Sequence, residues 1–142
     1  MQTVELHPRN ILAAEAKIPI GAPVTMINLV QFFEHAQYEI GGQKPCSGRE
    51  AYLERYAVAF NEVAAELKVQ NIEVIYAGTV AETILGPAEP KWDALAVVRY
   101  PNFAALRKVI ESPLYLEKAE PHRKAALKAW EFIATFQSQL GR

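Results

Sequence analysis

The sequence predicts an α+β domain built on one four-stranded antiparallel sheet, with two crossover helices on the same face. Apolar residues recur at helical spacing over residues 48–68. Strand-like segments lie before and after this stretch, at 24–33, 71–85, 92–100 and 130–136. A second helical region begins at Asn102, before the last of these segments, so the elements follow the order βαββαβ.

Length, composition and charge limit the classes of protein to which the chain can belong. The chain has 142 residues, 51% of them hydrophobic and 22% charged, which is the composition of one globular domain. The net charge is −1 with acids and bases interspersed, so we expect no nucleic-acid partner. No apolar run approaches the ~20 residues of a spanning helix, and the start lacks the pattern of a signal peptide. We therefore expect no membrane partner and a cytoplasmic location.

Neither cysteine nor histidine usage predicts a cofactor. Cys46 is the single cysteine, which excludes an internal disulfide, and we expect it to be a passive thiol. The three histidines, His7, His35 and His122, lack the spacing of a zinc site. We expect no metal and no bound cofactor.

The first part of the chain divides into an extension and the start of the domain. Residues 8–17 open with a first-turn proline and continue in good helix formers, so residues 1–21 form a helical extension and 22–142 a single domain. Residues 24–33 are apolar on both alternating faces, which is typical of a strand covered on two sides. Residues 35–48 contain glycines and prolines and form a loop, for which disorder and a functional role are both open.

The next elements are a helix and a hairpin. Tyr52, Tyr56 and Phe60 recur every four residues along the helix over 48–68, with charged residues mostly on the opposite side. The segments 71–85 and 92–100 pair as a hairpin, separated by a turn rich in glycine and proline.

Helix boundaries are marked in the C-terminal half. Asn102 and Ser112 are N-cap residues, and Pro113 suits the first turn after Ser112. Pro121 should kink or restart the helix just before His122 and Arg123. The last strand then covers residues 130–136.

This order predicts a ferredoxin-like βαββαβ sandwich. Strands 24–33 and 92–100 are apolar on both faces, yet the crossover helices cover only one face of the sheet. At about 25 cal/mol per Å² of apolar surface, an uncovered face would forgo many kcal/mol. We therefore expect a homodimer whose sheets pack face to face, forming a dimeric α/β barrel.

Several short motifs resemble one family: Tyr76-Ala-Gly78, Trp92-Asp93, Val97-Val98-Arg99-Tyr100-Pro101, Phe103, Ser112-Pro113-Leu114-Tyr115 and His122-Arg123-Lys124-Ala125-Ala126-Leu127. Roughly residues 22–137 are similar to the domain-of-unknown-function family numbered 1330, within the dimeric α/β-barrel superfamily. The loop at 39–48 and the first helix have no counterpart there, and Pro121 interrupts a segment that is usually unbroken helix. The resemblance implies dimerisation and a pocket between sheet and helices, with no established reaction.

Two adjacent residues are the candidates for catalysis. Arg123 suits the anchoring of a carboxylate or phosphate, and equally a structural ion pair. His122 suits proton transfer, although a structural, hydrogen-bonded histidine is the more common case. Adjacent helical positions lie about 100° apart, so both side chains share a pocket only if the bend at Pro121 turns them together.

The candidates for substrate binding are polar or aromatic: Asn28, Tyr56, Tyr76, Trp92, Tyr100 and Tyr115. Asn28 interrupts an apolar strand, so its amide needs a partner, which is a ligand, the protein or a partner subunit. The tyrosines, Tyr52 among them, suit a planar substrate, but core packing is the more common role of aromatic residues. Asp93 is expected to pair with Arg99 or Arg123.

The functional hypothesis is a small-molecule-binding dimeric barrel, or more specifically a cofactor-independent enzyme for a small organic or aromatic acid. The alternative is a non-catalytic oligomeric or sensory module whose polar cluster is structural. Haem binding through His122 is a third hypothesis.

Overall fold

The computed structural model describes residues 4–138. Its strands are β1 (Val24–Phe32), β2 (Glu73–Thr79), β3 (Ala94–Tyr100) and β4 (Leu127–Thr135), which form one four-stranded sheet in the order β2-β3-β1-β4. Every neighbouring pair is antiparallel. The predicted α+β architecture is confirmed, and the order of strands is consistent with a ferredoxin-like fold.

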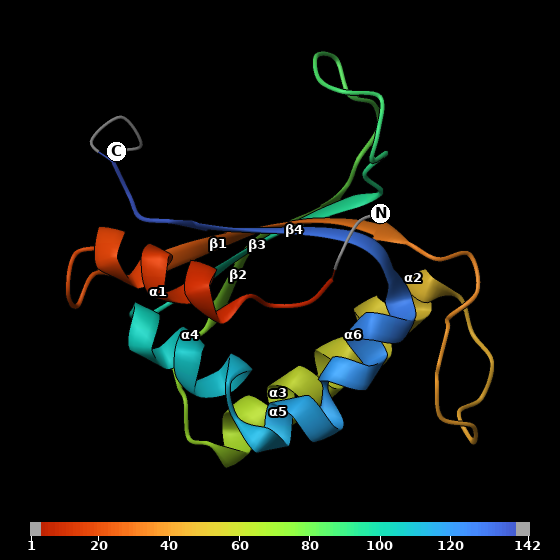
Figure 1. The fold of residues 1–142 in the computed structure, drawn as a ribbon, viewed down its shortest axis with the longest axis horizontal. Coiled ribbons are helices and arrows are strands. Elements are labelled where there is room, and N and C mark those ends of the chain that lie inside the picture. Colours follow the sequence, from red (N-terminus) through yellow and green to blue (C-terminus); the bar gives the residue numbers. More distant parts are fainter. Residues whose placement is uncertain (1–3, 139–142) are drawn as a thin grey trace.

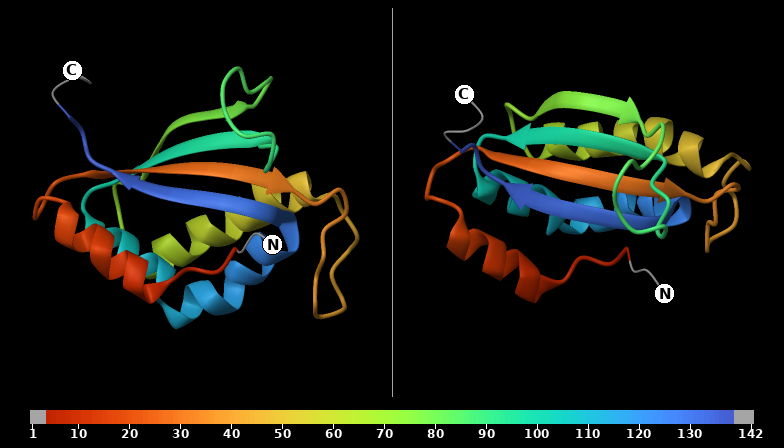
Figure 2. Two further views of the ribbon diagram at one scale, coloured as in Figure 1. Left: turned by 45° about the horizontal axis from the view of Figure 1, so that its top comes forward. Right: turned by 90° about the horizontal axis from the view of Figure 1, so that it is seen from above.

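Helical segments connect the strands on one side of the sheet. The first crossover is a continuous helix made of α2 (Gly48–Glu50), η1 (Ala51–Tyr56) and α3 (Ala57–Glu66). The second contains α4 (Phe103–Ile110), α5 (Pro113–Lys118) and α6 (Glu120–Ala126). Figures 1 and 2 show these helices on the same face of the sheet, while the loop between β2 and β3 projects from the opposite face.

The predicted caps begin the helices of the second crossover. Asn102 Oδ1 accepts a hydrogen bond of 2.8 Å from Ala105 N, and Ser112 Oγ accepts one of 3.0 Å from Tyr115 N. The break between α5 and α6 falls at Ala119, two residues before Pro121, where φ is −104°. The predicted restart just before His122 and Arg123 is therefore confirmed.

Several element boundaries differ from the predicted ones. β4 begins at Leu127 rather than at residue 130, because Leu127 and Ala129 pair with Phe32 and Gln31 of β1. β2 ends at Thr79, the last residue that pairs with β3, so residues 80–85 of the predicted strand belong to the projecting loop. The first crossover helix contains π-helical turns at Ala51–Tyr56, which its apolar spacing does not predict.

The N-terminal helix α1 (Pro8–Lys17) has the predicted bounds but is more than an appendage. Ile18, which follows it, is 8% exposed and joins the core cluster that contains Phe103, Leu106 and Ile110 of α4. Arg107 of α4 also forms an ion pair of 2.9 Å with Glu15 of α1. The extension thus closes one side of the core.

Gly48 lies where two backbone segments meet the start of the first crossover helix. Its N–H donates to Phe33 O at 3.1 Å, and Phe33 N donates to Ala126 O at 2.9 Å. A Cβ at position 48 would overlap Phe33 O and lie 2.7 Å from Ala126 O and 2.8 Å from Phe33 N. Backbone atoms of these two segments leave room only for glycine.

Substituting Gly48→Ala is therefore expected to destabilise the protein by about 3 kcal/mol or more, because backbone must move to admit the methyl group. Gly41→Ala is the matched control, since nothing lies within 4 Å of a Cβ there. Urea denaturation of both variants measures the difference. Equal stabilities would contradict the tight backbone packing.

Candidate functional site

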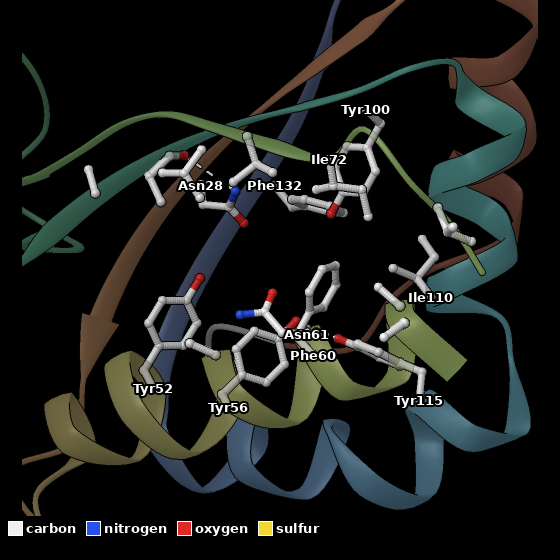
Figure 3. A pocket seen from close by; sticks show the side chains of 18 of the residues that line it. Asn28, Tyr52, Tyr56, Phe60, Asn61, Ile72, Tyr100, Ile110, Tyr115 and Phe132 are labelled. Atoms are coloured by element: carbon white, nitrogen blue, oxygen red, sulfur yellow. Dashed lines mark hydrogen bonds between the residues drawn. The ribbon is translucent and has the colours of Figure 1, made fainter. Parts of the chain in front are cut away.

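A cavity of about 740 Å³ lies between the sheet and the first crossover helix. Tyr52, Tyr56 and Phe60 line its helix side, and Figure 3 shows their rings facing Asn28 and Phe132 across the space. Tyr115 and Ile110, from the second crossover, line one end. The cavity is therefore bounded by aromatic side chains from both layers of the fold.

The helix side of the cavity is a packed row of rings. Residues 52, 56 and 60 are four apart, so they share one helix face. The rings of Tyr52 and Tyr56 stack with centroids 5.2 Å apart, and Tyr56 meets Tyr115 edge-on at 6.3 Å. Burial raises the pKa of Tyr52, Tyr56 and Tyr100 above its ordinary value. These hydroxyls stay protonated at neutral pH and can donate hydrogen bonds.

Arg123 is fully buried behind this row and does not line the cavity. Its Nη1 donates to Tyr115 Oη at 2.5 Å, and its Nη2 donates to Val4 O at 2.9 Å. The guanidinium lies 4.6 Å from the ring centroid of Trp130, and the Glu120 carboxylate is 3.5 Å away. Burial alone would lower the pKa of Arg123, but Tyr115, Tyr56 and Glu120 raise it, so the side chain remains charged.

Asn28 is satisfied by protein groups and also lines the cavity. Its Oδ1 accepts a hydrogen bond of 3.0 Å from Trp130 Nε1, and its Nδ2 donates to Ala96 O at 3.3 Å. These contacts hold the amide on the inner face of the sheet, where Val24, Met26 and Val30 are also buried. Neighbouring side chain and backbone thus supply the partners that a polar residue in this strand requires.

His122 points away from Arg123, to a surface cluster outside the cavity. Its Nδ1 shares a hydrogen bond of 2.7 Å with the Tyr38 hydroxyl, from the loop that follows β1. Arg55 lies over the Tyr38 ring at 5.6 Å and donates to Lys44 O at 2.6 Å. His122 and Arg55 therefore attach the 34–47 loop to the helices.

The predicted binding residues divide between the cavity and other parts of the fold. Asn28, Tyr56, Tyr100 and Tyr115 line the cavity, whereas Tyr76, Trp92, His122 and Arg123 do not. Between Val74 and Tyr76 a bulge shifts the register of β2, so Val74 pairs opposite Val98 and Tyr76 opposite Val97. Tyr76 consequently lies on the outer face of the sheet.

Trp92 and Asp93 lie just before β3 and do not line the cavity. The Asp93 carboxylate accepts a hydrogen bond of 2.8 Å from Phe32 N, and Asp93 N donates to Val30 O at 2.8 Å. The predicted pairing of Asp93 with Arg99 or Arg123 is wrong, since Arg99 pairs with Glu73 at 2.9 Å. A backbone amide is the partner because Asp93 lies beside β1.

Other lining residues were absent from the predicted set, among them Phe60, Asn61, Ile72, Ile110, Trp130 and Phe132. The four-residue spacing of Tyr52, Tyr56 and Phe60 carries a signal for Phe60. The alternation of Trp130 and Phe132 in the last strand carries it for two more. Asn61 has no such signal, because an exposed asparagine on a helix is ordinary.

Within residues 4–138, no group of three or more histidine, cysteine, aspartate or glutamate side chains is arranged to hold a metal ion. No helix in that range is both long and apolar enough to cross a membrane.

The chain is similar to two crystal structures of RPA0582. One, of the methylated protein, has 26% sequence identity and a TM-score of 0.81, covering 99% of this chain and 98% of that chain. The other, described as a protein of unknown function from Rhodopseudomonas palustris, has 25% identity and a TM-score of 0.80, covering 98% and 99%. The likeness extends over nearly the whole chain, including the N-terminal extension.

No protein-family model matches the chain, and no curated protein gives a significant match. The resemblance to the family numbered 1330 therefore stays a prediction.

The contact between His122 and the 34–47 loop is expected to weaken in acid. Burial and the charge of Arg55 lower the pKa of His122 below its ordinary value of 6.5, so the folded state favours the neutral ring. The neutral His122 ring therefore contributes to the free energy of unfolding. This contribution is fully present above pH 6.5 and is lost as the pH falls through the lowered pKa.

Urea denaturation between about pH 7 and pH 5 measures this effect. The free energy of unfolding should fall more steeply in the wild type than in His122→Gln, which has no titrating ring at this position. Arg55→Gln, which keeps the histidine but removes the neighbouring positive charge, should give an intermediate slope. Parallel curves for all three proteins would contradict the assignment.

Proposed function

We propose that the protein binds a small, planar, largely apolar organic molecule in the cavity between the sheet and the first crossover helix. The observation that carries this proposal is a space of about 740 Å³ with aromatic rings on two opposing sides. Small-molecule sites typically occupy roughly 300–1,000 Å³ and combine an apolar lining with a few polar groups. Asn28, Asn61 and the tyrosine hydroxyls are polar groups within the lining, and Lys68, Gln70 and Asn71 add polar side chains at its exposed end.

A turn at the end of α3 provides the entrance. Gln70, Asn71 and Val74 line the cavity and are exposed to solvent. Lys68 and Asn71 have φ values of 60° and 64°, in the left-handed region that residues other than glycine rarely adopt. This turn directs the chain away from the cavity before β2 begins, which leaves the cavity open at that end.

The lining favours binding over proton-transfer chemistry. Among the described residues that line the cavity there is no histidine, aspartate or glutamate, and His122 lies outside it. Tyr52 and Tyr56 are not available as bases at neutral pH, because burial raises their pKa and they stay protonated. A ligand-binding or sensory module is accordingly better supported than a catalyst that relies on His122 and Arg123.

Filling the cavity should abolish binding. Ala57 lines it, whereas the neighbouring Val58 does not and is 56% exposed. We expect Ala57→Phe to weaken binding of 2-acetylnaphthalene by about tenfold or more, because the new ring occupies the ligand's space. Val58→Phe should bind as the wild type does. Titration followed by tryptophan fluorescence measures both, and equal affinities would place the ligand elsewhere.

We also propose that two copies of the chain pack through the outer faces of their sheets, as in a dimeric α/β barrel. Strand pairing places Ile27, Val97 and Ile133 in one row on this face, and Leu29 beside Leu95 in the next. Tyr76 extends the first row and is 56% exposed. A second copy would cover this apolar surface.

The loop between β2 and β3 supports the same partner. It projects from the outer face (Figures 1 and 2), and Ile84 and Leu85 near its tip are 98% and 95% exposed. Two apolar side chains fully in water are costly for a single chain. A second sheet packed on the outer face would lie beside these loops.

Placing a charge on the outer face should separate the copies. We expect Val97→Glu to weaken association by about 2–5 kcal/mol, since each copy would bury an unpaired carboxylate at the interface. Val58→Glu introduces the same change on an exposed helix face and should leave the dimer intact. Sedimentation velocity at micromolar concentration distinguishes the two. A wild-type protein that is monomeric under these conditions would rule out the dimer.

A further inference from the structure

A chain of hydrogen bonds leads from Arg123 to the cavity, and its direction is determined at the buried end. The guanidinium has only donors, so the bond between Arg123 Nη1 and Tyr115 Oη requires the tyrosine oxygen to accept. The Tyr115 proton must then be donated to another group.

Tyr56 is the acceptor for that proton. Tyr115 is fully buried, and its oxygen lies 2.9 Å from the Tyr56 hydroxyl. If Tyr56 donated instead, the Tyr115 oxygen would accept twice and its own proton would have no acceptor among the described residues, at the cost of an unsatisfied buried donor. The direction is therefore Arg123 to Tyr115 to Tyr56. The proton of Tyr56 is left free, at a residue that lines the cavity.

A second oriented donor lies on the sheet side. The indole of Trp130 can only donate, so the Asn28 oxygen accepts and the orientation of the amide is determined. One hydrogen of Asn28 Nδ2 goes to Ala96 O, which leaves the other for the cavity that Asn28 lines. Both walls thus present donors.

We propose that the cavity recognises its planar ligand by a hydrogen-bond acceptor oxygen, a conjugated carbonyl or the corresponding enolate or phenolate, which Tyr56 binds and Asn28 faces. This inference rests on the proposed binding function and adds the polarity of the ligand. Because the hydrogen-bond chain begins at a buried cation, it favours an oxygen that carries partial or full negative charge. Arg123 and Tyr115 act through Tyr56 and are positioning residues.

Two probes that differ at one position test the inference. 2-Acetylnaphthalene carries a carbonyl oxygen, whereas 2-ethylnaphthalene has the same rings and a similar shape without an acceptor. We expect the wild type to bind the ketone about tenfold more tightly, as measured by ligand-observed NMR titration.

Tyr56→Phe should bring the two affinities close together by weakening only the ketone. Tyr76→Phe makes the same chemical change on the outer face, where Tyr76 does not line the cavity, and should keep the wild-type ratio.

Tyr115→Phe tests the relay separately, since it leaves the Tyr56 hydroxyl in place but disconnects it from Arg123. The preference for the ketone should fall while the affinity for 2-ethylnaphthalene stays the same. A purely structural role for Tyr115 would change both affinities together, or only the melting temperature.

The outcomes separate the inference from the function on which it rests. If neither probe binds the wild type, the proposed binding function fails. If both bind with equal affinity, or if Tyr56→Phe retains the preference for the ketone, the cavity binds planar molecules without recognising an acceptor, and the inference is overturned.

Discussion

The guanidinium of Arg123 is the group on which the arrangement around the cavity depends. A cation that is fully removed from water is tolerated only if the protein supplies acceptors for it. Those acceptors are the Tyr115 hydroxyl of α5, the neighbouring Glu120 carboxylate of α6 and, from the other end of the chain, the Val4 carbonyl; the Trp130 ring packs against the guanidinium. One side chain thereby ties the N-terminal extension and β4 to the second crossover. Among residues 4–138, no group accepts a hydrogen bond from its Nε, so the network is incomplete even here.

The cavity persists because its walls are held by contacts made outside it. Separate core clusters lie at each end of the sheet and between α3 and α5, so the rings that line the space are held from behind. A dry void of this size would be costly in a small domain. Exposed residues at the entrance, such as Gln70 and Asn71, make the space continuous with solvent instead.

The sequence predicts most of the fold because caps and apolar spacing are local signals. Asn102, Ser112 and the tyrosine row act through neighbours within a few residues, and the structure has them as predicted. The direction in which a side chain points is harder to predict, because it depends on backbone irregularities that no residue pattern indicates. A bulge moves Tyr76 to the outer face, and the helix restart at Ala119 does not turn His122 and Arg123, which are about 100° apart on a helix, to the same side. For these reasons Tyr76, His122 and Arg123 do not reach the cavity.

The same irregularities give the site its chemical character. Had Arg123 reached the cavity, the ligand would meet a full positive charge, and a carboxylate would be the natural partner. Because the charge is withdrawn behind Tyr115, the cavity receives its effect through a neutral phenol whose proton has one available direction. Such a donor suits a carbonyl, enolate or phenolate oxygen on an otherwise apolar molecule, because it stabilises partial or full negative charge on that oxygen. The apolar lining of the cavity and the polarity of its hydrogen-bond donors therefore favour the same kind of ligand.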